Sequence, residues 1–180
     1  MSSETEKPTP EFIKVEGSDI FFHCDVTTES VTELCQSVRK IEREHMGLGI
    51  DHPCVRIHIQ SDGGCLYPGL AALDFLKTTK AHVTCIAEGM CASAATFIFL
   101  AGDRRIVRPN AYVLIHQVSD TFWGTFEDLK DEMRQCHKLM RHIKRIYLSE
   151  TSLPVKKLDR LMKRDLYLSA RKCSKYGLEK

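Results

Sequence analysis

Short runs of alternating apolar and polar residues recur along the chain, and helical patterns separate them. Residues 54–60 (CVRIHIQ) alternate in this way, which is typical of a β-strand. Further strands are predicted at residues 19–24, 82–88, 104–108 and 112–117. Because strands alternate with helices, the pattern predicts an α/β fold with a mostly parallel sheet.

The segments between these strands carry helical spacing or helix-start signals. Ser30 and Glu33 are spaced as a capping box, which predicts a helix from there to about Met46. Residues 89–102 are rich in small and then in apolar residues, so a helix is predicted to start directly after the preceding strand. Further helices are predicted at residues 68–78, 125–150 and 154–162.

The long helix, at about 125–149, carries an apolar seam. The seam residues are alternately three and four positions apart: Phe126, Leu129, Met133, Cys136, Met140, Ile143 and Tyr147. This spacing is that of a coiled-coil heptad. Two interpretations stay open, because the seam can pack against the protein's own core or against a second copy of the chain.

Length and composition are those of one ordinary globular domain, with 180 residues, 43% hydrophobic and 28% charged. Residues 1–17 are polar and contain two prolines, so we expect a flexible tail ahead of a single domain at 18–180. The net charge of +2 gives no reason to expect nucleic acid or a membrane as a partner. Residues 125–180 hold 15 Lys/Arg against 8 Asp/Glu, and we expect this basic part to face solvent or protein.

The eight cysteines are scattered, and none forms a C-x-x-C pair, which argues against zinc-ribbon and thioredoxin-type sites. Residues 1–12 lack the apolar core or the arginine enrichment of a targeting signal. The longest apolar stretch, residues 89–102, is too short to span a bilayer. We therefore expect a cytoplasmic protein with reduced thiols, no bound metal and no membrane segment.

Residues suited to catalysis stand at the ends of predicted strands. Ser93 lies among small residues where a strand gives way to a helix, and His116 ends an apolar strand. Gly63 and Gly64 follow another strand, and Asp165 stands next to an arginine. Each of these features alone has an ordinary structural interpretation. In the same order, these are a helix cap, a structural histidine, a turn and a surface ion pair. Together they fit acyl transfer, since a serine needs a base to take its proton and an acid to hold the imidazole.

Four blocks follow one another over residues 54–178. They read S-D-G-G at 61–64, G-M-C-A-S at 89–93, A-G…P-N…I-H-Q between 101 and 117, and R-D-L-Y-L-S-A…Y-G-L between 164 and 178. In this order they resemble the proteolytic subunit of the Clp (caseinolytic) serine peptidases. The resemblance implies a crotonase-like α/β superhelix and a serine endopeptidase that works through an acyl-enzyme intermediate.

The resemblance also implies a role for each site residue. Ser93 would be the nucleophile, His116 the general base and Asp165 the acid that orients it. The backbone N–H groups of Gly64 and Ala94 would form the oxyanion hole.

Substrate and partners follow from the same resemblance. Gly63 and Gln117 would belong to the loops that hold a peptide or an unfolded protein. The long helix would be a handle that docks two heptameric rings into a barrel. A separate AAA+ unfoldase would use ATP to admit folded proteins, so this chain itself would need no cofactor.

Two departures from the family's pattern change these expectations. Asp62 stands where a proline is usual, next to the presumed oxyanion loop. Arg56 and His58 stand where the family commonly has aromatic residues, in the apolar pocket that grips the unfoldase. Because a charge weakens an apolar anchor pocket, we expect unfoldase docking to be impaired.

Three alternatives remain beside the active peptidase. The chain could be a catalytically silent ring scaffold, or a crotonase-type acyl-CoA enzyme of the same fold. The presence of all three triad residues argues against both. A peptidase dedicated to maturing the proteins of a virus or phage is the third alternative, and the sequence does not separate it from general protein turnover.

Overall fold

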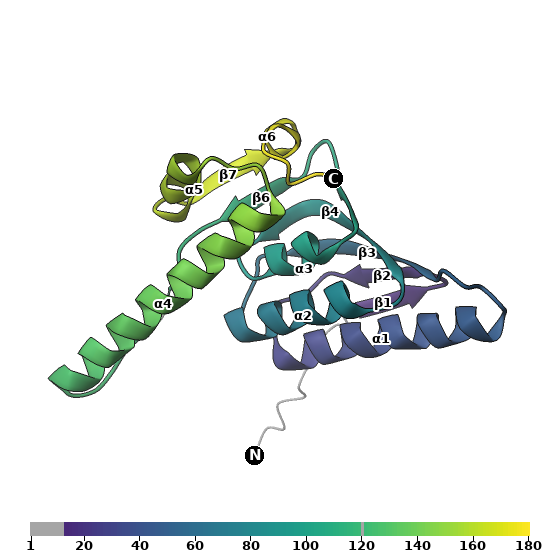
Figure 1. Ribbon diagram of the computed structural model, residues 1–180, viewed down its shortest axis with the longest axis horizontal. Helices are drawn as coiled ribbons and strands as arrows, with labels where there is room; N and C mark the ends of the chain where they lie inside the picture. The colour runs from purple at the N-terminus through teal and green to yellow at the C-terminus, as the bar shows by residue number, and fades with distance from the viewer. Residues whose placement is uncertain (1–12, 120) are drawn as a thin grey trace, which may run out of the picture.

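A seven-stranded sheet forms the centre of the computed structural model, which describes residues 13–119 and 121–180 (Figure 1). The strands are β1 (Ile13–Glu16), β2 (Asp19–Phe22), β3 (Cys54–Ser61), β4 (His82–Ala92), β5 (Arg104–Val107), β6 (Tyr112–Ile115) and β7 (Leu166–Ser169). Their order is β1-β2-β3-β4-β6-β7, and β5 also pairs with β4. Strands β2 to β6 form parallel pairs, whereas β1 and β7 pair antiparallel at the two edges. The predicted α/β fold with a mostly parallel sheet is confirmed.

The helices divide into a layer on the sheet and a projecting arm. They are α1 (Thr28–Gly47), α2 (Leu66–Thr78), α3 (Ala95–Ala101), α4 (Phe126–Glu150), α5 (Val155–Met162) and α6 (Ala170–Lys175). In Figure 1, α1, α2 and α3 lie along one face of the sheet, and the first half of α4 extends away from the body. Within the two described ranges, no helix has both the length and the apolar character needed to cross a membrane.

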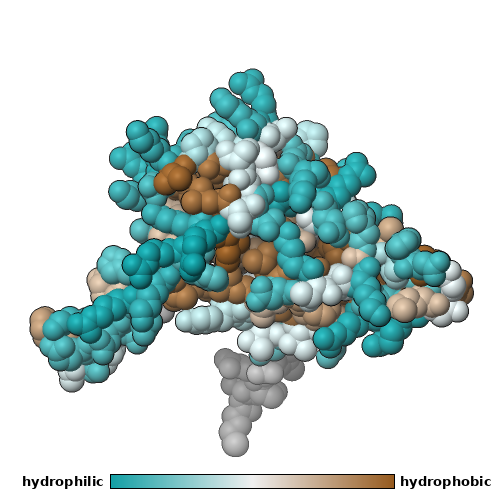
Figure 2. Space-filling view, in the orientation of Figure 1, coloured by the Kyte–Doolittle hydropathy of each residue, from teal (hydrophilic) through white to brown (hydrophobic). Residues whose placement is uncertain are grey.

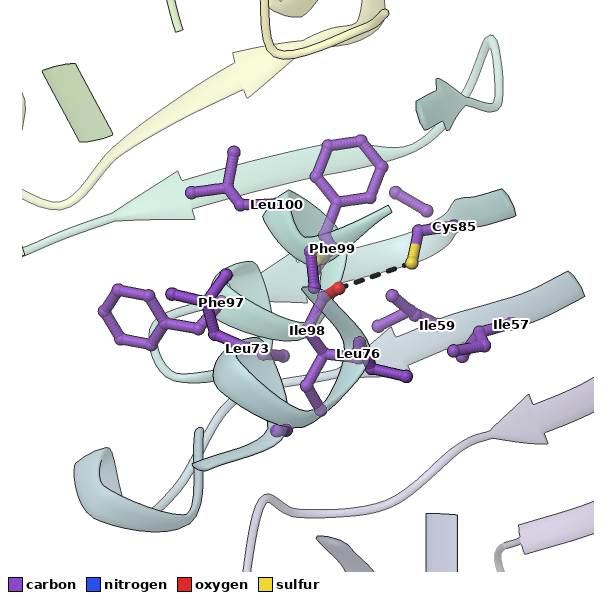
Figure 3. Close-up of a cluster of buried hydrophobic side chains, with 14 of the residues drawn as sticks. Ile57, Ile59, Leu73, Leu76, Cys85, Phe97, Ile98, Phe99 and Leu100 are labelled. Atoms are coloured by element: carbon purple, nitrogen blue, oxygen red, sulfur yellow. Dashed lines mark hydrogen bonds between the residues drawn. The ribbon is translucent and has the colours of Figure 1, made fainter. Parts of the chain in front are cut away.

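The hydrophobic core takes side chains from the sheet and from all six helices, and Figure 3 shows its part between the sheet, α2 and α3. Every residue of α3 is buried, which explains why this segment has no polar face in the sequence. Ile57 and Ile59 from β3 pack with Leu76 from α2 in this core. The Cys85 thiol donates to the carbonyl oxygen of Ile98, and its burial raises the pKa of the thiol to about 12. It is a structural cysteine rather than a reactive one.

The first part of the chain differs from two expectations. The flexible tail predicted for residues 1–17 extends too far, because Ile13–Glu16 pair with β2, while residues 1–12 lie outside the described residues. Helix α1 also begins before the predicted cap. Thr27 is its N-cap: its hydroxyl accepts from the Ser30 N–H at 3.2 Å, and the Thr27 N–H donates to the Ser30 hydroxyl at 2.9 Å.

The helix predicted for residues 89–102 is wrong in its first part. Strand β4 continues to Ala92, because Met90–Ala92 pair with β6, and only residues 95–101 are helical. The turn between strand and helix is therefore at Ser93 and Ala94 rather than at Gly89. This shift decides where the site lies.

The long helix predicted at residues 125–150 is confirmed as α4. Its apolar seam divides into two halves: packing against the protein's own core is confirmed for the second half, and contact with a second copy stays a prediction for the first. Ile143 and Tyr147 are buried in the protein's own core. Phe126, Leu129 and Met133 are 73%, 43% and 56% exposed in the projecting half.

Candidate functional site

The candidate site is built on strand ends that the sheet brings together. The carboxyl ends of β3, β4 and β6 lie side by side, with Ser61 opposite Cys91 and Ala92 opposite Leu114. The Ser93 N–H continues this pairing and donates to the Leu114 carbonyl oxygen at 2.9 Å. Residues that follow these strands are therefore neighbours, as in other open parallel sheets.

Ser93 is held in an unusual backbone conformation at this edge. Among residues 13–119 and 121–180 it is the one non-glycine residue with a positive φ, of +53°. Such a conformation costs free energy and persists where the surroundings enforce it, which is common at functional sites. The surroundings here are the Thr96 N–H and hydroxyl, which donate to the Ser93 carbonyl oxygen at 3.0 Å and 2.5 Å. The half-buried serine is thereby fixed at the start of α3.

Gly63 and Gly64 form a tight loop against the serine. A side chain at Gly63 would place its Cβ 2.5 Å from the Ser93 Cβ, and one at Gly64 would be 2.5 Å from the Val26 carbonyl oxygen. Both glycines have positive φ, of +105° and +139°. Val26 fixes the loop by donating to the Gly63 carbonyl oxygen and accepting from the Cys65 N–H, at 2.6 Å and 2.8 Å. Only glycine fits between Val26 and Ser93.

Two backbone N–H groups beside Ser93 are left without an internal partner. Throughout the described residues, no hydrogen bond uses the N–H of Gly64 or of Ala94. Ala94 immediately precedes the first helical residue of α3, where N–H groups have no partner within the helix. Unpaired N–H groups next to a serine hydroxyl can bind a negatively charged oxygen.

A cavity of about 1050 Å³ opens onto these groups. Among the predicted site residues, its walls include Gly64, Ser93, Ala94, His116 and Gln117. Gly63 lies behind Ser93 rather than on the cavity surface. In Figure 2, hydrophobic side chains gather over α3 and beside the upper half of α4, and hydrophilic ones cover the outer side of α4. The cavity is large enough for several residues of a peptide.

The positions of His116 and Asp165 depend on the pairing of β6 with β7. Ile115 is opposite Leu166 in this antiparallel pair, and the pairing ends there, since the Leu166 N–H donates to the Arg164 carbonyl oxygen in a tight turn at Asp165. Asp165 is exposed and does not line the cavity. In the described part of the chain, no hydrogen bond joins the His116 ring to Ser93 or to Asp165. The structure thus brings the histidine to the serine's cavity. Asp165 stands one residue before β7, which pairs with the strand that ends one residue before His116, and the described residues show no hydrogen-bonded triad.

Some residues at the site were not predicted from the sequence. Thr96 binds Ser93, and its hydroxyl also lies 2.5 Å from the Tyr147 hydroxyl of α4. Burial raises the pKa of Tyr147, so its hydroxyl stays protonated and donates to Thr96. The three-residue spacing of Ser93 and Thr96 at a helix start was a usable signal for the first contact. Asp62, in contrast, is exposed and lies off the cavity.

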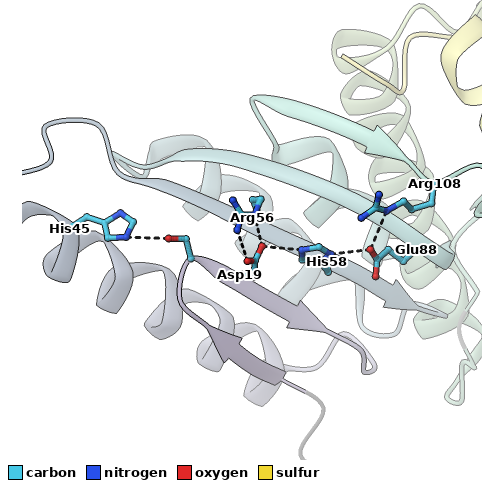
Figure 4. Close-up of polar contacts among 7 residues, drawn as sticks. Asp19, His45, Arg56, His58, Glu88 and Arg108 are labelled. Carbon is cyan, nitrogen blue, oxygen red and sulfur yellow. Dashed lines mark hydrogen bonds and ion pairs between the residues drawn. The ribbon is translucent and has the colours of Figure 1, made fainter.

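The strand residues Arg56 and His58 lie on the other face of the sheet, in a charged network (Figure 4). Arg56 donates to both carboxylate oxygens of Asp19 at 2.5 Å. The His58 ring lies between Asp19, 3.1 Å from Nε2, and Glu88, 3.0 Å from Nδ1. Arg108 closes the row at 3.3 Å from Glu88. Both ring nitrogens of His58 therefore face carboxylate oxygens, one from β2 and one from β4.

The carboxyl groups of this network ionise more readily than usual. The hydrogen bond from Arg56 lowers the pKa of Asp19, with His58 adding to the effect. Burial by itself would raise the pKa of Glu88, but hydrogen bonds and charges from His58 and Arg108 outweigh it, so that this pKa is also lowered. The outer face of the sheet is therefore ionic at neutral pH where an apolar pocket would be expected in the resembling family.

Comparisons with known proteins agree with the motifs. A family model described as Clp protease matches residues 15–179. The "ATP-dependent Clp protease proteolytic subunit" of Deinococcus radiodurans is 37% identical over 126 residues, which are 69% of this chain and 62% of that protein. The protein of the same name from Chlorella vulgaris is 36% identical over 124 residues, covering 68% of this chain and 62% of the relative. The chain thus spans about 62% of the length of these curated relatives.

Proposed function

Because the chain belongs to the Clp protease family, we propose that it is a serine endopeptidase that cleaves peptides and unfolded proteins in its cavity. The observation that carries the proposal is the strained turn at Ser93. It faces a 1050 Å³ cavity that His116 also lines, beside two backbone N–H groups that have no hydrogen-bond partner among the described residues. These are the parts that acyl transfer needs: a nucleophile, a base and an oxyanion hole.

The proposed reaction has two stages. The Ser93 hydroxyl oxygen attacks the peptide carbonyl carbon while its proton passes to the His116 ring. The carbonyl oxygen gains negative charge and accepts hydrogen bonds from the Gly64 and Ala94 N–H groups. His116 then gives the proton to the leaving amine, and an acyl-enzyme remains. Water repeats the sequence: it attacks the acyl carbon, His116 takes its proton and returns it to Ser93, and the carboxylic acid leaves.

Asp165 is assigned the role of orienting the His116 ring. Asp165 and His116 each adjoin one end of the β6–β7 pair, at Leu166 and Ile115, and this supports the role. Hydrogen bonds at active sites are often long before substrate binds and tighten in the complex. We propose that substrate or assembly turns the His116 ring toward both Ser93 and Asp165.

Self-assembly is the second part of the proposal. The exposed apolar residues Phe126, Leu129 and Met133 on the projecting half of α4 suit a contact between copies of the chain. We assign α4 the role of the handle between two stacked rings, with seven copies to a ring as the family resemblance implies. Residues that are exposed in one chain would then be buried in the assembly.

Entry of substrate is proposed not to depend on an ordinary unfoldase. Arg56 and His58 are tied into the ionic network with Asp19 and Glu88, so an apolar docking loop would have to desolvate charged groups. Peptides and unfolded chains would enter unaided. The chain itself would use no cofactor, and ATP would enter only through a separate partner. Its eight free cysteines suit a reducing compartment, which supports a cytoplasmic location.

A catalytically silent ring subunit is a second candidate. One observation favours it, namely that no hydrogen bond within the described residues links Ser93 to His116. A silent subunit would assemble and bind peptides without cleaving them.

Hydrolysis of a fluorogenic peptide by the full chain tests the proposal. We expect turnover that Ser93→Ala abolishes and that Ser174→Ala leaves unchanged, because Ser174 is an exposed serine of α6, away from the cavity. Size-exclusion chromatography of each sample should show the same oligomer. Absence of hydrolysis by a well-assembled wild-type protein would support the silent subunit instead.

A further inference from the structure

One wall of the cavity is a basic face of α4. Lys138, His142 and Arg145 are spaced by four and three residues, so they lie on one side of the helix. All three line the cavity that holds Ser93. The ammonium group of Lys138 and the guanidinium group of Arg145 each carry a positive charge, and both groups are hydrogen-bond donors only.

Within residues 13–119 and 121–180, no ion pair compensates the charges of Lys138 and Arg145. Elsewhere on α4, Lys130 pairs with Glu127 and Lys144 pairs with Asp159. An unpaired cation in a cavity is available to an anionic group of a ligand.

The acidic residues of the cavity lie apart from this face. Glu132 precedes Lys138 by six residues, which is about 9 Å along the helix, toward the projecting end. Asp25 belongs to the opposite wall, beside Val26 and the glycine loop. The α4 wall from Lys138 onward is therefore the positive side of the cavity.

The same part of α4 lies closest to the reactive groups. Tyr147 is hydrogen-bonded to Thr96, which in turn holds Ser93. The Val118 N–H, two residues after His116, donates to the Met140 sulfur at 3.3 Å. The contacts at Met140 and Tyr147 enclose the segment that carries His142 and Arg145, so these basic side chains border the place where a peptide must lie.

From this arrangement we propose that the site selects peptide segments with acidic side chains beside the bond that is cut, through Lys138 and Arg145. This inference rests on the proposed peptidase function and names its substrate class. Arg145 can bind a carboxylate with two parallel hydrogen bonds, and Lys138 supplies a point charge. Apolar residues of the cavity wall accept the neighbouring side chains: Leu139 and Ile143 lie between Lys138 and Arg145 on α4, and Phe97 comes from α3. The preferred segment is thus an apolar centre flanked by Asp or Glu.

Two decapeptides test the proposal, with the same apolar centre flanked by glutamates in one and by glutamines in the other. The wild-type chain should cleave the glutamate peptide with a kcat/KM about fivefold higher, because each exposed ion pair contributes only modestly. In Lys138→Gln/Arg145→Gln the ratio should fall to about one. A matched control, Arg141→Gln/Lys156→Gln, changes the net charge equally at exposed residues off the cavity and should keep the ratio. High salt should remove the preference in the wild type, because it screens exposed charges.

Binding separates failure of this inference from failure of the proposed function. The Ser93→Ala chain should bind the fluorescently labelled glutamate peptide about fivefold more tightly than the glutamine peptide, even if no chain cleaves either. Equal binding and equal cleavage of the two peptides would overturn the inference and leave the peptidase function standing. A preference that survives Lys138→Gln/Arg145→Gln would also overturn it.

Discussion

Thr96 donates its hydroxyl to the carbonyl oxygen of Ser93 across 2.5 Å, and this contact ties the candidate nucleophile to the long helix. Because the Thr96 hydroxyl also accepts from Tyr147, a chain of two hydrogen bonds runs from α4 to the turn. Ser93 has the positive φ that such a tie can enforce. A displacement of α4 would therefore change the position of Ser93.

Replacing Thr96 tests this tie. Thr96→Val keeps the shape of the side chain but leaves the buried Tyr147 hydroxyl and the Ser93 carbonyl without this partner. We expect kcat to fall about tenfold with little change in KM, and the free energy of unfolding to fall by about 1–2 kcal/mol. Thr96→Ser should restore kcat. A Val variant with normal kcat would show that the tie does not position Ser93.

The close approach of Gly63 to Ser93 gives a second prediction. Gly63→Ala would force its Cβ to within 2.5 Å of the Ser93 Cβ and 2.9 Å of the Ala92 carbonyl oxygen, at a φ of +105°. We expect hydrolysis to fall at least about 100-fold, because small displacements of reacting groups cost that much. Gly47→Ala is the control, since nothing lies within 4 Å of the position that its Cβ would take and its φ is not in the left-handed region. It should be neutral or slightly stabilising in thermal unfolding, with normal hydrolysis.

The neighbourhood of the site residues was predictable because each of the blocks follows or precedes a strand. Ser93 and His116 come directly after strands of a parallel sheet, and Gly64 comes three residues after another; such strands end at one edge. Gly63 was predictable for a related reason, since a glycine pair after a strand permits a close backbone approach. Local signals were sufficient for these residues because their positions depend mainly on the topology of the sheet.

Long-range contacts account for what the sequence did not reveal. The extension of β4 to Ala92 depends on pairing with β6, so the local small-residue pattern wrongly indicated a helix from Gly89. The bond from Tyr147 to Thr96 joins residues 51 positions apart. In the sequence, His58 only departed from an apolar pattern. Its two carboxylate partners come from β2 and β4, and only the register of these strands with β3 places them next to His58. Whether His116 engages Asp165 depends on a side-chain rotation that no sequence pattern reports.

The charged network on the outer face predicts a pH dependence of stability. The pKa values of Asp19 and Glu88 are lowered in the folded chain, so their contribution is present above the unfolded value of about 4 and is lost as the pH falls through the folded values. At pH 7, Asp19→Asn/Glu88→Gln should reduce the free energy of unfolding by about 1–2 kcal/mol. Between pH 4 and pH 2, the variant should lose less stability than the wild type in urea titrations.

A matched control for this network is Asp51→Asn. Asp51 is an exposed carboxylate without an ion pair within the described residues. Its variant should follow the wild-type pH profile. If Asp19→Asn/Glu88→Gln follows that profile as well, the network does not stabilise the fold.

The exposed apolar residues on the projecting half of α4 lead to a prediction: negative charge placed there should weaken assembly. Leu129→Asp/Met133→Asp places two carboxylates on the exposed apolar surface that we assign to contact between copies. We expect analytical ultracentrifugation to show a smaller oligomer, with unchanged helix content, because burying an unpaired charge opposes association. His137→Asp is the control on the same half of the helix, since His137 is exposed and is not one of the seam residues. An unchanged oligomer in the double variant would assign assembly to another surface.

The central claim is that Ser93 is an activated nucleophile, and covalent labelling tests it most directly. A fluorophosphonate reacts with a serine whose proton is taken by a base, and mass spectrometry of the digested protein locates the adduct. We predict one adduct, on the peptide that contains Ser93, which is lost in Ser93→Ala and strongly reduced in His116→Ala. An assembled wild-type chain that carries no adduct, or carries it on another serine, would contradict the account.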